Sequence, residues 1–298
     1  MKNEIRSAAL LFLTAAIWGF AMSAQREGSQ YLSPLTFNAF RFTLGSAVLL
    51  PLMIREIKRN GEPLTGKETG KGIVLGCILV LASFLQQMSV GEAGAGKSGF
   101  LTALYVVLVP VIGVLFKKKT RITTWLALML ALPALYFLCV PKGESIALKG
   151  SDTGLLAGAV FWALHILVTD EFVKKVSPLK LCTVQFAVGA VMNWIGALLF
   201  ETITAENILH ALIPVLYCGV MSTGVGYLCQ TIGQKGCRPA FAALILSLES
   251  VFCVISGALL LGERMDVRGY AGCALMLMAV ILAQAGAIFV PAKEETHV

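Results

Sequence analysis

The sequence predicts an all-α integral membrane protein with ten transmembrane helices, arranged as two inverted repeats of five helices each. Three observations lead to this prediction. Apolar residues make up 57% of the 298 residues and charged residues only 14%, a balance outside the range of soluble domains. Apolar runs of about 20 residues, the length that a helix needs to cross a bilayer, recur along the chain. The second half of the sequence also repeats the first.

Ten apolar runs of spanning length follow one another from the N-terminus. The segments between them are short and carry turn signals, such as Ser33-Pro34 and Pro141-Lys142-Gly143, so no soluble domain fits between two runs. We therefore expect transmembrane helices at about residues 7–25, 35–54, 72–90, 98–116, 122–140, 153–169, 180–200, 209–231, 239–261 and 268–289.

The basic residues orient these helices. Most of the 24 lysines and arginines fall in the segments that share a side with the N-terminus, so the positive-inside rule places both termini in the cytoplasm. The net charge of +7 then follows from topology, and no long basic run with interleaved aromatic residues indicates nucleic acid. We expect a multi-pass protein of the cytoplasmic membrane. The first apolar run resembles a signal peptide, but the repeat indicates that it is retained.

The repeat divides the chain into residues 1–145 and 146–298. A shift of 144 residues superposes identical residues of the two halves: Trp18 on Trp162, Ser33-Pro34 on Ser177-Pro178, and Gly45 on Gly189. A shift of 143 places Gln87 on Gln230. Because five is an odd number, the second half must cross the membrane in the opposite direction. Inverted repeats are characteristic of secondary transporters, whose substrate site lies near the midplane between the two halves.

One carboxylate, Glu249, lies near the middle of the apolar run 239–261. A charge at that depth costs roughly 2.5 to 3.5 kcal/mol, so the side chain should face the interior of the bundle or a wet cavity. Two roles stay open: a functional group that binds a proton or a cation, and a protonated carboxyl that only hydrogen-bonds a neighbouring helix. The repeat also leaves open whether Tyr105 or Val109 is its counterpart in the first half.

Several other polar and aromatic side chains within the spans should face inward, because lipid solvates polar groups poorly. Gln and Asn side chains have an alternative role, hydrogen bonding between helices at a gain of about 0.6 kcal/mol, and Arg41 has the alternative of extending to the membrane surface. The primary candidates for a substrate pocket are Trp18, Gln87, Tyr105, Trp162, His165, Tyr227, Gln230 and Glu249, and the secondary candidates are Asn38, Arg41, Gln86 and Gln185.

Some other motifs indicate packing rather than chemistry. Residues 91–98 match the P-loop pattern G-x-x-x-x-G-K-S, but a P-loop follows a buried strand, whereas this segment joins two membrane helices. Gly72-x-x-x-Gly76 and Gly154-x-x-x-Gly158 are small-residue faces for close helix contact. The eight cysteines form no C-x-x-C pair, and the three histidines are far apart, so we expect no metal, no cofactor and no catalytic residue.

These motifs together resemble the drug/metabolite transporter superfamily, in its EamA-type branch, over nearly the whole chain. The resemblance is carried by Ala16-Ile17-Trp18-Gly19, by Pro34 through Arg41-Phe42, by Ala103 through Pro110, and by Leu248-Glu249 with Leu261-Gly262-Glu263-Arg264. It implies alternating access around a central cavity built mainly from helices one, three, four, six, eight and nine. The chain departs from the family pattern at Ser250, where the family often has Pro, and at Lys117-Lys118-Lys119, where it has Gly-Glu.

The resemblance also implies a function. Members of this branch export amino acids and other small metabolites, and some take up choline-like or sugar-like compounds. We therefore expect a secondary transporter that moves an amino acid or a related metabolite out of the cell, with the bilayer, a small-molecule substrate and a coupling proton as its partners. The alternatives are an uptake carrier for a choline-like quaternary amine and a membrane-embedded enzyme, which would need paired acid and base groups. The sequence leaves the oligomeric state open.

Overall fold

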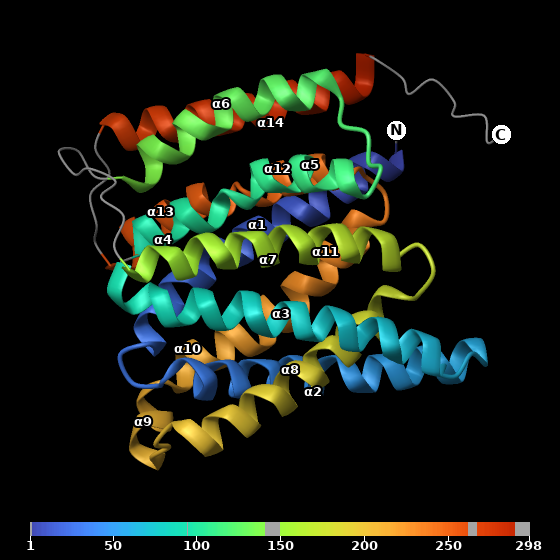
Figure 1. Cartoon of the computed structure of the whole chain (residues 1–298), viewed down its shortest axis with the longest axis vertical. Helices are drawn as coiled ribbons and strands as arrows, with labels where there is room; N and C mark the ends of the chain where they lie inside the picture. Colours follow the sequence, from blue (N-terminus) through green and yellow to red (C-terminus); the bar gives the residue numbers. More distant parts are fainter. Residues whose placement is uncertain (1, 94, 141–149, 262–266, 290–298) are drawn as a thin grey trace.

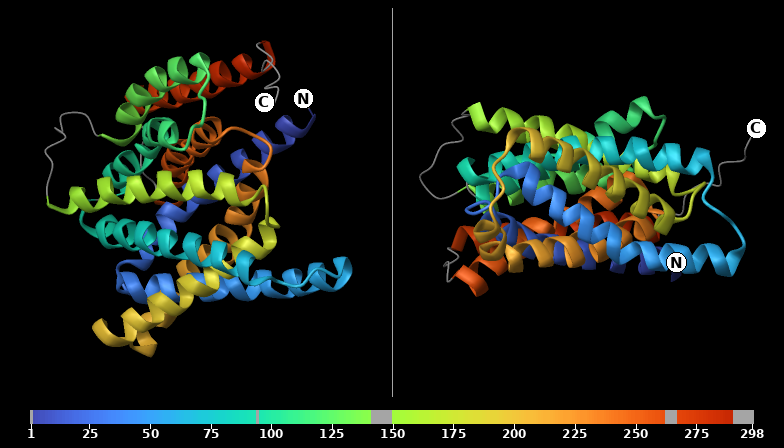
Figure 2. Two further views of the ribbon diagram at one scale, coloured as in Figure 1. Left: turned by 45° about the vertical axis from the view of Figure 1, so that its right-hand side comes forward. Right: turned by 90° about the horizontal axis from the view of Figure 1, so that it is seen from below.

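The computed structural model describes residues 2–93, 95–140, 150–261 and 267–289, and these residues form helices and connecting turns without any strand. The helices run between two ends of one bundle (Figures 1 and 2). Seven predicted spans are single helices: α1 (Lys2–Gly28), α2 (Pro34–Asn60), α3 (Gly66–Ala93), α6 (Ile122–Cys139), α7 (Gly150–Phe172), α8 (Pro178–Phe200) and α14 (Val267–Phe289).

The other three predicted spans are interrupted. Their segments are α4 (Ala95–Ala103) and α5 (Tyr105–Leu115), then α9 (Ala205–His210), α10 (Leu212–Leu216), the π-helix η1 (Tyr217–Gly226) and α11 (Tyr227–Gln234), and last α12 (Pro239–Leu246) and α13 (Glu249–Leu261). Within the described residues, eight helical segments are long and apolar enough to cross a membrane, and two shorter apolar helices accompany them. This set fits the ten predicted spans.

Proline and glycine set several helix ends. Pro34, Pro178 and Pro239 each occupy the first turn of a helix, where the missing backbone N–H has no helical partner to lose. The helix α2 ends at Gly61, whose φ of 69° is a left-handed conformation that glycine adopts without strain. The single spans therefore begin and end close to where the turn signals of the sequence placed them.

The two halves pack against each other through equivalent helices. The helix α2 packs on α8 and α6 packs on α14, and these two pairs lie at opposite edges of the bundle (Figure 1). Between them, α3 packs on α7 while α1 packs on η1 and α11, which are equivalent contacts under the repeat. The turn from α3 to α4 and the turn from α11 to α12 lie at opposite ends (Figure 1). The second repeat therefore runs in the inverted direction.

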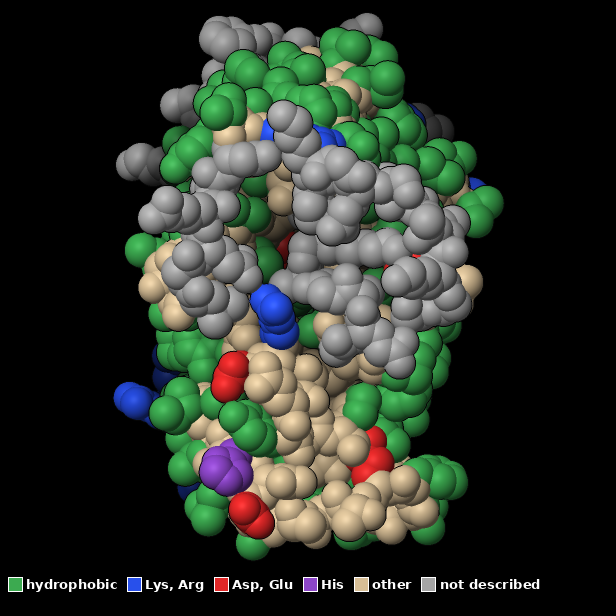
Figure 3. Space-filling view, turned by 90° about the vertical axis from the view of Figure 1, so that its left-hand side faces the viewer, with side chains coloured by type: hydrophobic (Ala, Val, Ile, Leu, Met, Phe, Trp, Pro, Cys, Tyr) green, Lys and Arg blue, Asp and Glu red, His purple; other side chains and the backbone are tan. Residues whose placement is uncertain are grey.

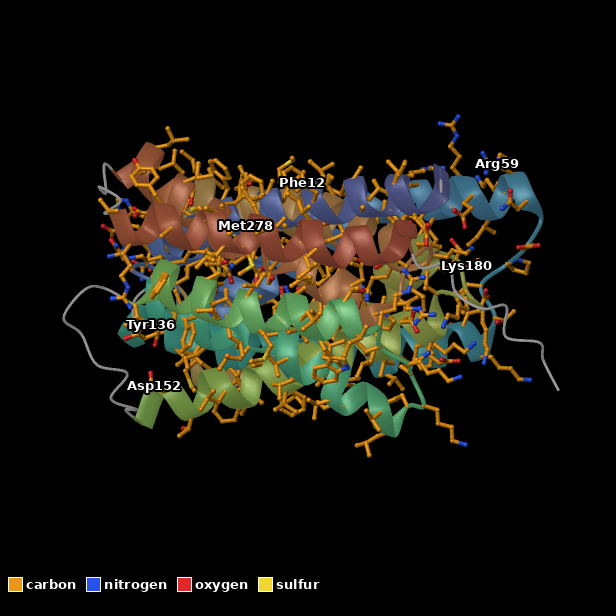
Figure 4. The ribbon with its side chains drawn as sticks, turned by 90° about the horizontal axis from the view of Figure 1, so that it is seen from above. Phe12, Arg59, Tyr136, Asp152, Lys180 and Met278 are labelled. Carbon is orange, nitrogen blue, oxygen red and sulfur yellow. The ribbon has the colours of Figure 1, made fainter. Side chains whose placement is uncertain are left out.

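Charged side chains separate one end of the bundle from the other. We call the basic end the one that holds the turns 61–65, 116–121, 173–177 and 235–238. Arg59 and Lys180 lie at this end, whereas Tyr136 and Asp152 lie at the opposite end (Figure 4). Between the ends, apolar side chains such as Phe12 and Met278 are exposed along the sides of the bundle (Figure 4). Because α1 begins and α14 ends at the basic end (Figure 1), the positive-inside rule predicts that this end faces the cytoplasm.

The two small-residue faces make the close helix contacts that the sequence predicted. A Cβ atom on Gly72 would lie 2.5 Å from Val184, and one on Gly76 would lie 2.8 Å from Val188, so both glycines press against α8. Gly154 and Gly158 lie against α3 in the same way, although less tightly. The P-loop-like segment 91–98 includes the end of α3 and the start of α4, and the side chains of residues 91–97 lie outside those that the structure describes.

We predict that Gly76→Val destabilises the protein by roughly 1–3 kcal/mol, because the added side chain overlaps Val188 and the backbone carbonyl of Gln185 in a contact that cannot expand without strain. The measurement is the thermal denaturation midpoint in detergent. Gly70→Val is the matched control on the same helix, since the space around Gly70 is open. Equal midpoints for the two variants would contradict the assigned packing of α3 on α8.

Candidate functional site

A buried cavity lies between the two repeats, at the depth where the helices are interrupted. Its volume is about 30 Å³, which is enough for a water molecule and far below the roughly 300 Å³ of a typical metabolite pocket. In this structure the cavity is therefore too small for an amino acid. The lining residues come from both repeats: Trp18, Ala21, Met22, Gln25, Arg41, Gln86, Thr102, Tyr105, Trp162, Ile166, Ser222, Tyr227, Gln230 and Glu249.

Two helix interruptions bring Tyr105 and Glu249 together. Tyr105 is the first residue of α5 and Glu249 is the first residue of α13, and the Tyr105 hydroxyl donates a hydrogen bond of 3.3 Å to Glu249 Oε1. The two residues are 144 positions apart, the shift that relates the repeats, so the structure selects Tyr105 over Val109 as the counterpart of Glu249. A carboxylate in the first turn of a helix is stabilised by the positive end of the helix dipole.

Serine side chains accompany the break between α12 and α13. The Ser247 hydroxyl donates to the carbonyl of Leu244 at 2.7 Å, and the Ser250 hydroxyl donates to the carbonyl of Ser247 at 2.8 Å. Such local bonds compete with the regular helical ladder. The break therefore forms with Ser250 at the position where the family pattern has proline.

The eighth predicted span, residues 209–231, departs from α-helical geometry over ten residues, which form the π-helix η1. Long π-helices are rare, and π-helical turns often lie at functional sites. The Trp18 indole Nε1 donates to the carbonyl of Ser222 at 3.2 Å, and the Thr14 hydroxyl donates to the carbonyl of Gly226 at 3.1 Å. The π-helix is thus bonded to α1 beside the cavity.

Arg41 faces the cavity rather than the membrane surface. Its side chain is 2% exposed, and Nη1 donates to Gln25 Oε1 at 3.1 Å while Nε donates to Thr223 Oγ1 at 3.3 Å. An arginine, Arg41, and a carboxyl group, that of Glu249, therefore line one cavity. Of the two alternatives for Arg41, extension to the membrane surface and burial beside the cavity, the structure has the second.

Aromatic rings form the rest of the cavity wall. The ring centroids of Trp18 and Tyr227 are 4.7 Å apart, and Trp162 lies 6.4 Å from the first and 6.3 Å from the second. Within the described residues, the indole Nε1 of Trp162 and the Oε1 of Gln230 are buried without a hydrogen-bond partner. The wall therefore offers an unused donor and an unused acceptor.

Four of the predicted residues lie outside the lining of the cavity. His165 Nε2 pairs with Gln185 Oε1 at 2.9 Å, and the His165 ring packs edge-on against Tyr227. Gln87 donates to the backbone carbonyl of Gln25 at 3.3 Å. Asn38 is fully buried, and within the described residues its side chain has no partner. These residues surround and support the lining rather than form it.

The prediction missed several lining residues, of which Gln25 is the most informative. Gln25 lies beside the charged pair Arg26-Glu27 at the end of the first span and has no identical counterpart in the second repeat, so neither criterion selected it. Its spacing from Trp18 and Met22 was the available signal, because residues three and four apart share a helix face. The other lining residues that were missed are Ala21, Met22, Thr102, Ile166 and Ser222.

Ion pairs close the basic end of the bundle. Lys118, which follows α5, bridges to Asp170 at 2.8 Å and to Glu171 at 2.9 Å at the end of α7, and Lys174 also pairs with Asp170 at 2.9 Å. Partial burial lowers the pKa of Lys118, but the hydrogen bonds to the two carboxylates outweigh it and raise that pKa above its ordinary value. Lys118 therefore stays charged and ties the first repeat to the second.

At the opposite end, the described contact between the repeats near the centre of the bundle is a hydrogen bond between hydroxyl groups. The Ser23 and Ser256 hydroxyls share a hydrogen bond of 2.7 Å between α1 and α13. Figure 3 shows this end hollowed near its centre, with an acidic side chain visible inside the hollow. The two ends thus join the repeats by different contacts: ion pairs at the basic end and a hydroxyl contact between α1 and α13 at the opposite end.

Inverted repeats around a cavity at helix breaks, lined by an arginine and a carboxyl group, are typical of a membrane transporter. The sequence model of the EamA-like transporter family matches residues 5–140 and 150–284. The chain belongs to this family, and its two matches correspond to the two repeats. Among the described residues, no group of three or more His, Cys, Asp or Glu side chains is placed to hold a metal ion.

Known relatives agree with this membership. An uncharacterized transporter of Archaeoglobus fulgidus is 27% identical over 91% of this chain and 83% of its own length. The uncharacterized transporter YwfM of Bacillus subtilis is 28% identical over 99% of this chain and 98% of its own length. A solved crystal structure at 16% identity superposes with a TM-score of 0.79 over 95% of this chain and 98% of that one, which shows the same fold.

We predict that Lys118→Gln lowers the free energy of unfolding by roughly 1–3 kcal/mol, because it removes charged hydrogen bonds to the buried carboxylate of Asp170. Since the pKa of Lys118 is raised in the folded protein, this stabilisation is complete at neutral pH and is lost only as the pH rises above about 10.4. The measurement is the denaturation midpoint at pH 7.

Lys175→Gln is the control for that variant. Lys175 lies 3.7 Å from Glu171, and both side chains are exposed, so its loss should cost less than about 0.5 kcal/mol. If Lys175→Gln destabilised the protein as much as Lys118→Gln, the stabilisation would be a general effect of charge at the basic end rather than of the bridge to Asp170.

Proposed function

We propose that the protein is a secondary transporter that exports a small zwitterionic metabolite, an amino acid or a close relative, by alternating access. The observation that carries the proposal is that Arg41 and Glu249 line the same buried cavity. A zwitterion presents a carboxylate and an ammonium group, and these two side chains are complementary to both. The direction of transport follows the branch of the family that the sequence resembles.

In this proposal Arg41 binds the substrate carboxylate. A guanidinium group offers five N–H donors in a planar fork and pairs with a carboxylate through two parallel hydrogen bonds. The bonds of Arg41 to Gln25 and Thr223 hold the side chain in place before the substrate arrives, which reduces the entropy lost on binding. Burial strengthens the attraction, because two charges interact more strongly in a low-dielectric interior than in water.

Glu249 binds the substrate ammonium. The hydrogen bond from Tyr105 fixes one carboxylate oxygen and leaves the other for the ligand. The indole N–H of Trp162 and the side-chain amide oxygen of Gln230, which have no partner among the described residues, are then available to a polar group on the substrate side chain. Buried polar groups are normally hydrogen-bonded, so an empty cavity lined by such groups favours a polar ligand.

Alternating access requires the cavity to expand and to open at one end at a time. A volume of about 30 Å³ excludes an amino acid, so binding must be coupled to a rocking of the repeats. The contacts that would exchange are the Lys118 bridges at the basic end and the Ser23 contact with Ser256 at the opposite end.

An uptake carrier for a choline-like quaternary amine is the second candidate function. The rings of Trp18, Trp162 and Tyr227 beside Glu249 suit a cation that is held by aromatic faces and a carboxylate. Arg41 argues against it, because a buried positive charge in the same cavity repels a ligand that carries no anionic group.

We predict that amino acids raise the denaturation midpoint of the purified protein, and that both Arg41→Gln and Glu249→Gln abolish this shift. Bound ligand stabilises the folded state by RT ln(1 + [L]/Kd), about 2.7 kcal/mol at a hundredfold excess over Kd. The panel contains amino acids, choline-like amines, sugars and nucleosides. Arg55→Gln and Glu206→Gln are matched controls at exposed positions, and they should respond as the unaltered protein does.

Other outcomes separate the alternatives. A shift with quaternary amines alone, lost in Glu249→Gln and retained in Arg41→Gln, would replace the zwitterion with a cation. Amino-acid binding that survives in Glu249→Gln while gradient-driven transport into proteoliposomes stops would assign Glu249 to a coupling proton. A midpoint that no compound moves, together with product formation by the purified protein, would replace the transporter with an enzyme.

A further inference from the structure

A second cavity lies at the basic end of the bundle and shares no lining residue with the central cavity. Its volume is about 270 Å³, and its wall includes Arg121, Thr124, Arg238, Phe241 and Ala283. These residues come from the starts of α6 and α12 and from α14, so the cavity joins the two repeats. None of the contacts of the proposed transport site uses it.

We infer that this cavity binds the phosphate of an anionic phospholipid. The first support is charge. Arg121 precedes α6 and Arg238 precedes α12, both in extended conformation, so two helix N-termini and two guanidinium groups converge on one space. Helix N-termini carry partial positive charge and exposed N–H groups that favour phosphate. The exposed side chain of Glu4 also lies on the wall, so the lining contains two arginines and one carboxyl group.

The second support is a hydroxyl group on the cavity wall. Thr124 is 5% exposed as a residue and lines the cavity, and its hydroxyl makes no hydrogen bond to another described residue. Polar side chains in such positions normally have a partner. A phosphate oxygen held by the two arginines would accept a hydrogen bond from the Thr124 hydroxyl. A bound ligand would therefore provide the partner that the described protein residues do not.

The third support concerns the source of the phosphate. Ala240, Phe241 and Ala283 give the cavity an apolar wall next to its charged groups. The helices α6 and α14 lie at the edge of the bundle (Figure 1), and Ile122 and Ile281 on them are exposed along the lipid-facing sides. A headgroup in the cavity could therefore keep its acyl chains in the bilayer, as in other basic pockets between transmembrane helices.

A lipid in this position would connect segments that belong to the closed basic end. Arg238 donates from Nη1 to the carbonyl of Lys119 at 3.3 Å, which joins the turn before α12 to the turn that also carries Lys118. A phosphate between Arg121 and Arg238 would add a second connection between the same two turns. The bound lipid thus stabilises the conformation in which the basic end is closed.

The test is thermal denaturation of the detergent-purified full chain with three additions: phosphatidylglycerol, phosphatidylcholine, and inorganic phosphate. We expect phosphatidylglycerol to raise the midpoint by several degrees and phosphatidylcholine to leave it unchanged. Arg121→Gln with Arg238→Gln should weaken the response to phosphatidylglycerol by about tenfold or more in concentration, because charged hydrogen bonds are lost. Lys58→Gln with Arg59→Gln removes two exposed charges at the same end and is the matched control.

Native mass spectrometry of the unaltered protein provides a measurement that does not depend on the variants folding. We expect one tightly retained phosphatidylglycerol, and Thr124→Val should reduce its retention without changing the number of charges. An unchanged midpoint with phosphatidylglycerol, or an equal loss of response in the Lys58 and Arg59 variant, would overturn the proposal. A full shift with inorganic phosphate alone would assign the cavity to a soluble anion and reject the lipid.

Discussion

The structure depends on the enclosure of an arginine and a carboxyl group inside a membrane protein. Neither Arg41 nor Glu249 can face lipid without a cost of a few kcal/mol, so both must be surrounded by protein or by a small volume of water. The bundle provides this with polar partners at both sites: Gln25 and Thr223 hold Arg41, and Tyr105 holds Glu249. The helix breaks before α5 and α13 and the π-helix lie around these groups, because irregular backbone at membrane depth is tolerated only where it is buried in protein or lines a cavity.

The two repeats share a topology and differ in detail. The third span is the regular α-helix α3, whereas its repeat counterpart, the span 209–231, contains the π-helix η1. Trp18 donates its indole N–H to the π-helix, while its repeat counterpart Trp162 leaves the same group without a partner. The repeats are therefore related in topology but not in the conformation of their equivalent segments.

The sequence alone predicted most of the fold and part of the site. Apolar length, turn residues and the 144-residue repeat predicted ten spans in two inverted sets, which the described helices fit, because these features depend on local composition and on the thickness of the bilayer. The sequence also pointed to Glu249, Tyr105, Trp18 and Trp162 as lining residues, because they are polar or aromatic side chains near the middle of apolar spans. Gln25 and the π-helix could not be found this way, since a hydrogen bond to Arg41 and a change of helical register depend on neighbours distant in sequence.

What the sequence determined by itself is a membrane-spanning bundle of inverted repeats with one carboxylate at its centre. Periodicity and hydropathy report the depth of a residue and the face of its helix, and those quantities need no knowledge of other helices. The tertiary structure decided which faces meet. It placed Arg41 toward the cavity, set Gln87 and His165 behind the lining, and aligned Tyr105 with Glu249. Such choices follow from the rotation and packing of each helix against its neighbours, which side-chain packing fixes and local sequence does not.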